Sequence, residues 1–168
     1  GHRMFDDLVK VPLIFSGLNI PSNKEILQQV RHVDIFPTIE DVLSLPKKNN
    51  IDGESLLPLI DNKKIHENPA YIESPPAVKE EHVKKKIIGI RTSSYKMLKQ
   101  ADSGDVVELY DLVKDPLEEE NIVSSHPELV KEMESKLEKI MSSKKITTTE
   151  NKVDLTKIES ELEKLGYR

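Results

Sequence analysis

The first sixty residues hold the most apolar segments of the chain, and their pattern predicts two elements. Val11–Gly17 is a short, continuous apolar run closed by a glycine, which predicts a strand buried on both faces of a parallel or mixed sheet. From Ile35 to Leu45, apolar residues recur at helical spacing. The Asp34 side chain can accept bonds from the free amides of the first turn, and Pro46 ends the pattern. We therefore expect a helix over 35–45, with Ile35, Ile39, Val42 and Leu43 on one face.

Shorter runs in the middle of the chain predict a small antiparallel sheet. Residues 51–60 indicate a turn followed by one short helical turn, and Ala70–Ser74 indicates a short strand stopped by two prolines. The next three β-type runs are separated by short polar loops, a spacing typical of an antiparallel meander. The runs are Ile87–Thr92, Tyr95–Lys99 and Val106–Tyr110.

The last third of the chain is helical in pattern. Ser125 and Glu128 match a capping box, and the stripe after it should face a core. That stripe is Leu129, Met133, Leu137 and Ile140. Residues 142–152 are rich in Ser, Thr and Lys and indicate a linker. A final amphipathic helix is expected after it, with Leu155, Ile158, Leu162 and Leu165 on one face and Gly166 at its end.

These elements predict an α/β unit at the front and a small α+β unit behind it. The expected division is 1–76 for the α/β part, 77–141 for the antiparallel sheet and helix, and 142–168 for the linker and final helix. At 168 residues the chain is about one domain, with 36% hydrophobic and 33% charged residues. That balance suits either a solvated two-layer domain or a piece of a larger protein whose most apolar strands lie elsewhere.

Charge and composition exclude several classes of protein. The net charge is −5, the basic run Lys84–Lys86 is faced by Glu80 and Glu81, and aromatic residues make up 4% of the chain. These features argue against nucleic-acid binding. No apolar run approaches the roughly 20 residues that span a bilayer. The chain has no cysteine, which excludes disulfides, thiolate metal sites and a Cys nucleophile within it. No secretory signal begins the sequence, and the location stays open, with the cytoplasm slightly favoured.

Several blocks, in this order, resemble the last third of sulfatases and of their phosphonate and phosphodiester hydrolase relatives in the alkaline phosphatase superfamily. They are Met4–Gly17, Val30–Thr38, Asp52–Leu59, Ile90–Thr92 with Tyr95–Lys96, Glu108–Leu112, Asp115–Pro116 before Glu120–Asn121, and Leu165–Tyr167. Each block is weak alone, but their joint order covers nearly the whole chain. The resemblance implies the end portion of a doubly wound alkaline-phosphatase-like α/β sheet, followed by a small antiparallel sheet with helices.

The resemblance also implies what the chain does not contain. In the family, the nucleophile lies far upstream, as a formylglycine made in a Cys/Ser-x-Pro-x-Arg setting or as a Ser or Thr. This chain has no Cys, and none of its Ser residues begins such a motif. The family's metal-binding Asp pairs would also precede residue 1. The chain alone should therefore be inactive and hold no cofactor. A divalent metal (calcium, manganese or zinc) and formylglycine are expected in the parent, with a sulfate, phosphate or phosphonate ester as substrate.

One residue matches a position of the family's active site. A Gly-His or a Lys often stands shortly before the core strand in relatives, where it donates to an anion oxygen, and Gly1-His2 is at the matching place. Such a donor stabilises charge that builds on the ester. The competing interpretation is that Gly1-His2 is a cloning remnant or an inert terminus.

The remaining titratable residues fit structural roles. His32 and Asp34 could form a base with its orienting carboxylate, but helix capping by Asp34 explains them more simply. Asp6-Asp7 could bind a metal, although adjacent acids before an apolar strand are usually exposed. Surface positions are expected for His66, His82, His126 and the acidic run Glu118–Glu120.

Two functions remain open at this point. The chain can be the carboxy-terminal segment of an ester hydrolase, completing the sheet and walling the substrate cleft. Alternatively, it is a stand-alone, non-catalytic binding or assembly module that kept this architecture. If the other strands of the front sheet are missing, an exposed edge and apolar faces should promote self-association.

Overall fold

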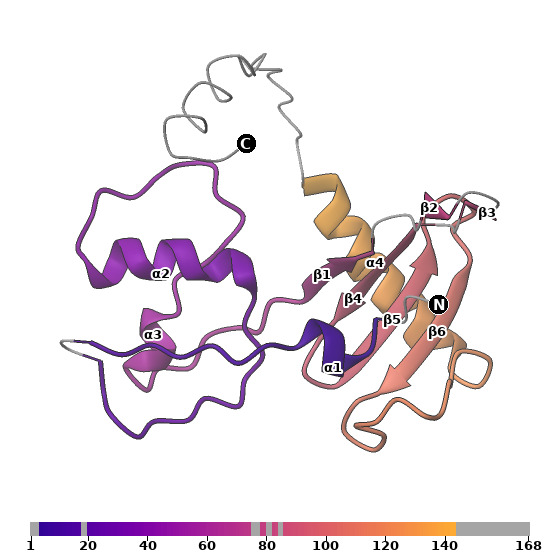
Figure 1. The fold of residues 1–168 in the computed structure, drawn as a ribbon, viewed down its shortest axis with the longest axis horizontal. Coiled ribbons are helices and arrows are strands. Elements are labelled where there is room, and N and C mark those ends of the chain that lie inside the picture. The colour runs from indigo at the N-terminus through magenta and orange to yellow at the C-terminus, as the bar shows by residue number, and fades with distance from the viewer. Residues whose placement is uncertain (1–3, 18–19, 75–77, 80–81, 84–85, 144–168) are drawn as a thin grey trace, which may run out of the picture.

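The computed structural model describes residues 4–17, 20–74, 78–79, 82–83 and 86–143. A front unit carries α1 (Asp6–Val9), the 3-10 turn η1 (His32–Asp34), α2 (Ile35–Val42) and α3 (Leu57–Ile60). A sheet unit follows, with β1 (Ala70–Glu73), β4 (Ile87–Arg91), β5 (Tyr95–Gln100), β6 (Val106–Asp111) and α4 (Pro127–Ser143). A short hairpin of β2 (Val78–Lys79) and β3 (His82–Val83) lies between β1 and β4 in the chain. Figure 1 shows the two units side by side, with the sheet and α4 at the right.

The sheet confirms the predicted antiparallel arrangement. Its order is β1-β4-β5-β6, and every neighbouring pair is antiparallel. On one face, Ile90, Met97 and Leu109 are in register across three strands and have no exposed surface. Met133 and Leu137 of α4 pack against this row, with Leu129 and Ile140 beside them. The predicted helical stripe therefore closes the core of this unit.

The opposite face of the sheet receives the start of the chain. Side chains alternate between faces along a strand, so Lys96 points away from the α4 core that Met97 joins. The Lys96 ammonium reaches the carbonyl of Met4, and the rings of Phe5 and Tyr110 meet edge-on with centroids 6.5 Å apart. Segments more than 90 residues apart in sequence are thereby packed together.

The front unit is held by polar contacts around α2. The Thr38 hydroxyl donates to the Asp34 carbonyl at 2.6 Å and accepts from the Leu56 amide at 2.8 Å. A methyl group added at Gly53 would lie 1.8 Å from the carbonyl oxygen of Val33. This position therefore requires glycine because the two backbone segments touch.

Three predictions for the front unit are wrong. Val11–Gly17 forms no strand, and among the described residues no strand lies beside it to supply hydrogen bonds. The helix after Asp34 ends at Val42, with Ser44 at φ 52°, and its expected inward residues Ile39 and Leu43 are 42% and 61% exposed. The buried α2 positions are Pro37, Thr38 and Glu40.

Two predicted caps are absent as well. The Asp34 side chain makes no capping bond to α2. Its carboxylate accepts instead from the Arg31 amide and guanidinium and from the Glu54 amide. The Ser125 hydroxyl donates to the Ile122 carbonyl and meets the His126 ring, and α4 begins at Pro127. In both places, the side chain expected to cap the helix is hydrogen-bonded to other groups.

The fold class is that of the expected small antiparallel sheet with helices, whereas the division at residues 76 and 141 stays a prediction. In the part of the chain that the structure describes, no helix combines the length and apolarity needed to cross a bilayer.

Candidate functional site: a buried ionic cluster

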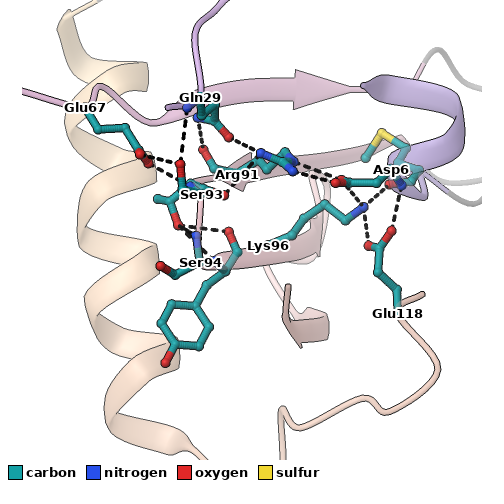
Figure 2. Close-up of polar contacts among 11 residues, drawn as sticks. Asp6, Gln29, Glu67, Arg91, Ser93, Ser94, Lys96 and Glu118 are labelled. Atoms are coloured by element: carbon teal, nitrogen blue, oxygen red, sulfur yellow. Dashed lines mark hydrogen bonds and ion pairs between the residues drawn. The ribbon is translucent and has the colours of Figure 1, made fainter. Parts of the chain in front are cut away.

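The most concentrated polar chemistry in the described residues surrounds Lys96 of β5 (Figure 2). The Lys96 side chain has no exposed surface. Its Nζ donates to the Met4 carbonyl at 2.7 Å, lies 3.3 Å from Asp6 Oδ1, and forms an ion pair with Glu118 Oε1. An ammonium without such partners would be costly at this depth. The two carboxylates and the carbonyl therefore account for its burial.

Arg91 of β4 supplies the second cation. It is the register partner of Lys96 on the neighbouring strand, so two positive side chains stand directly opposite each other, an arrangement that destabilises a sheet. Asp6 compensates this repulsion. The Arg91 Nε is 2.9 Å from Asp6 Oδ1, and its Nη2 is 2.5 Å from Asp6 Oδ2. This two-point geometry is the strongest that guanidinium and carboxylate form.

Glu118 closes the cluster from the loop after β6. Its Oε2 accepts from the backbone amide of Asp6 at 2.6 Å, while its Oε1 faces Lys96. Two cations and two anions thus meet, drawn from α1, two strands and the acidic loop. Because the two positive and two negative charges compensate each other, the cluster can be buried, and it fixes Met4 and Asp6 on the sheet.

The ionisation of Asp6 reflects these contacts. Burial acts to raise the pKa of the Asp6 carboxyl, but hydrogen bonding and charge from Arg91, with Lys96 behind them, outweigh it and hold the pKa below its usual value. Asp6 therefore stays ionised and keeps both cations paired.

An outer layer of polar groups extends the cluster toward solvent. The Arg91 Nη1 donates to Gln29 Oε1, and the Gln29 amide nitrogen Nε2 donates to the Arg91 carbonyl at 3.0 Å. At the β4–β5 turn, the Ser93 amide donates to Glu67 at 2.7 Å, and its hydroxyl donates to the same carboxylate at 2.5 Å. No histidine of the described residues contacts Ser93, so this pair orders the turn and does not form an activated nucleophile.

An open apolar groove of about 980 Å³ lies next to the cluster. It runs between the extended segment after α1, the loop before η1 and the β1 edge of the sheet. Its walls include Val11, Leu13, Phe15, Ile26, Tyr71 and Arg91.

The described residues do not fit a catalytic metal. No group of three or more His, Asp or Glu side chains converges within them, and the two carboxylates that do approach each other are taken up by Lys96 and Arg91. No chemical step is therefore assigned to a metal held by this part of the chain.

The structure describes most of the titratable residues that the sequence singled out, but not the predicted site residue. His2, the proposed anion contact, lies outside the described residues, and the side chain of His82 is likewise not described. His66, His126 and Asp7 are exposed, as expected, and His32 is exposed as well.

Two expectations about acidic residues are wrong. Asp6 is half-buried in the cluster, and Glu118 is only 4% exposed, whereas Glu119 and Glu120 are at the surface. Both were expected at the surface because acidic pairs and runs usually are, but each has a buried cation as its partner.

Sequence reasoning missed the cluster, although one signal pointed to it. In the predicted meander, Arg91 and Lys96 flank the turn between the first two runs and fall on paired positions. Two cations that face each other in a sheet call for an anion between them. Which of the 30 acidic residues supplies it cannot be read from local pattern.

Comparisons with known proteins agree on one family. The family described as "N-sulphoglucosamine sulphohydrolase, C-terminal" matches residues 2–144. Among curated relatives, arylsulfatase K of dog is 30% identical over 151 residues and that of chicken 31% over 151 residues. Each match covers 87% of this chain but 28% of the relative. The chain thus spans little more than a quarter of the length of these relatives.

Solved structures give the same result. A protein solved in complex with its substrate D-glucosamine-2-N,6-O-disulfate is 28% identical at a TM-score of 0.56, over 71% of this chain and 25% of that one. A candidate sulfatase from Bacteroides thetaiotaomicron, 23% identical at a TM-score of 0.56, covers 66% of this chain and 24% of its own, and shows the shared fold.

Proposed function

Since the chain belongs to the family of N-sulphoglucosamine sulphohydrolase carboxy-terminal domains, we propose that it is the carboxy-terminal part of a sulfuric ester hydrolase and has no catalytic activity alone. The observation that carries this proposal is a family match without the family's nucleophile motif. The family match runs from residue 2 to residue 144, yet the sequence contains no Cys and no Ser-x-Pro-x-Arg segment from which the nucleophile could come.

In this proposal, the chain serves as a scaffold that positions the segment at its start. The sheet and α4 form a closed core, and the ionic cluster fixes Met4 and Asp6 on the sheet. Met4 stands two residues after His2 in the sequence. We propose that His2 donates to an ester anion in the parent, and the anchoring of Met4 and Asp6 on the sheet supports this because it fixes the segment that follows.

The substrate class follows from the relatives. One structural relative has a sulfated glucosamine as its substrate, and the curated relatives are arylsulfatases. We therefore favour a sulfate ester over the phosphate and phosphonate esters that the sequence left open. In the parent, a divalent metal and a formylglycine would supply the attacking group and hold the sulfate, from residues outside this chain.

An assay of the purified 168-residue chain tests the first part of the proposal. We expect no release of aryl alcohol from an aryl sulfate or aryl phosphate, with calcium, manganese or zinc added. Metal-dependent turnover would contradict it, because the nucleophile would then lie within these residues.

Reading the coding region upstream of residue 1 separates the enzyme from a non-catalytic module. A Cys/Ser-x-Pro-x-Arg segment with paired Asp residues supports the hydrolase. A start codon directly before residue 1 supports a binding or assembly module instead.

A further inference from the structure

The outer edge of β6 is covered by the loop that follows it. Among the described residues, β6 is the last strand of the sheet and pairs with β5 on one side. Neighbouring residues of a strand direct their backbone groups to opposite sides. Leu109 uses its N–H and C=O on the outer side, so Tyr110 directs its own toward β5. An uncovered edge of this kind would be a template for another strand.

Asn121 occupies the place of a peptide group from a neighbouring strand. Its Nδ2 donates to the Val107 carbonyl at 2.9 Å, and its Oδ1 accepts from the Leu109 amide at 3.1 Å. The amide of Ile122 then donates to the Leu109 carbonyl at 2.9 Å. One side chain and one backbone group thus satisfy three outward groups of β6.

Two aspartates of the same loop fix its shape. Asp111 Oδ1 accepts from the amides of Val113 and Lys114, each at 3.1 Å, and Asp115 Oδ2 accepts from the amide of Glu120 at 2.8 Å. These backbone donors hold the pKa of both carboxyls below the ordinary value. Both side chains therefore stay ionised at neutral pH and keep the loop folded beside β6.

Glu118 connects the loop to the start of the chain. Its backbone has φ 59°, a left-handed conformation that is uncommon for glutamate and persists where surrounding contacts impose it. The side chain supplies those contacts, because it accepts from the Asp6 amide at 2.6 Å and pairs with Lys96 (Figure 2). The docked start of the chain thus holds the loop at its least favourable backbone position.

We propose that residues 112–122 form an edge strap, which seals β6 against pairing with another strand and is fastened by the docked start of the chain. Asn121 supplies the seal, and Glu118 supplies the fastening. Loss of either side chain should open the outward N–H of Leu109. The strap takes no part in the proposed hydrolase chemistry, so its failure would leave that proposal untouched.

Amide hydrogen exchange on the 168-residue chain, resolved by residue, tests the seal. Asn121→Ala removes the acceptor of the Leu109 N–H, whose exchange should become about tenfold faster relative to that of Tyr110. Asn121→Asp is the matched variant, because its carboxylate keeps this acceptor and loses only the donor to Val107. It should leave Leu109 protected. Ser125→Ala removes a hydroxyl bond just beyond the strap and should change neither amide.

The same measurement tests the fastening. Glu118→Gln removes the charge that pairs with Lys96 and should make the exchange of Leu109 several-fold faster relative to Tyr110. Glu119→Gln is the matched control, the same substitution at the next residue of the strap, whose side chain is exposed. It should have no effect on either amide.

Light scattering tests what the seal prevents. At high protein concentration, Asn121→Ala should form larger species than the unchanged chain, because its open β6 edge is free to pair between copies. The Leu109 amide should regain protection as these species form.

Three results would overturn the proposal. One is unchanged exchange of Leu109 in Asn121→Ala, which would mean that the side chain does not seal the edge. A second is an equal effect of Glu118→Gln and Glu119→Gln, which would remove the fastening role of Glu118. The third is an exposed Leu109 amide without added association, which would show that the strap is not what keeps β6 from pairing.

Discussion

At the scale of single residues, the feature that distinguishes this chain is a lysine with no solvent contact. Lys96 is compensated by Glu118 and Asp6, which lie on opposite sides of it in the sequence. Replacing a buried ion pair by apolar residues is often tolerated, but removing one partner leaves an unpaired charge. The cluster is therefore far more sensitive to single substitutions than its net contribution to stability suggests.

Lys96→Met should lower the free energy of unfolding by about 3 to 5 kcal/mol, because Glu118 would remain buried without its cation. Urea unfolding at neutral pH measures the change. Lys99→Met is the matched control, the same substitution on the same strand at a lysine whose ion pair with Glu134 is partly exposed. It should cost less than about 1 kcal/mol. Equal losses for the two variants would show that Lys96 is not specially compensated.

Local pattern could not predict the cluster. Asp6 and Arg91 are 85 residues apart in the chain, and the Asp6 amide and Glu118 are 112 apart. An acidic residue in a polar run looks solvated unless the fold brings a cation to it. Sequence could place Arg91 and Lys96 on paired strands, but their partners come only with the tertiary structure.

At the scale of elements, prediction succeeded where an element pairs or packs with elements next to it in the sequence. The meander of β4, β5 and β6 joins consecutive runs, and the stripe of α4 packs on the sheet just before it. Val11–Gly17 failed because a doubly buried strand needs partners on both sides, and the described residues supply neither. The same cause explains why the apolar side of α2 is open.

The contact between η1 and the loop before α3 is a second sensitive point. Gly53→Ala would place a methyl group 1.8 Å from the Val33 carbonyl oxygen, so the two backbones must separate, at a cost of about 2 to 3 kcal/mol. Gly104→Ala is the control. Its methyl group would meet no atom within 4 Å, and the residue has φ 76°, which costs about 1 kcal/mol. Thermal unfolding compares them, and an unaffected Gly53→Ala protein would disprove the contact.

At the scale of the whole molecule, the contact between the front unit and the sheet unit depends on Asp6. Asp6 lies in α1 of the front unit, and its carboxylate pairs with Arg91 and Lys96 of the sheet (Figures 1 and 2). Gln29, from the loop before η1, reaches the same arginine. The attachment of one unit to the other is therefore electrostatic in large part, and it should respond to pH.

The sign of that response follows from the pKa of the Asp6 carboxyl, which lies below its ordinary value in the folded chain. A carboxyl with a depressed pKa stabilises the fold above its unfolded pKa of about 3.9, and the benefit is lost as pH falls through the folded value. The unchanged chain should therefore have a higher free energy of unfolding than Asp6→Asn. This difference should be constant near neutral pH and should become smaller below about pH 4. Urea unfolding from pH 7 to pH 3 measures it. Asp7→Asn removes an exposed neighbour that contacts neither cation and should cost less at pH 7. A difference that widens in acid would mean that Asp6 is not held ionised by Arg91 and Lys96.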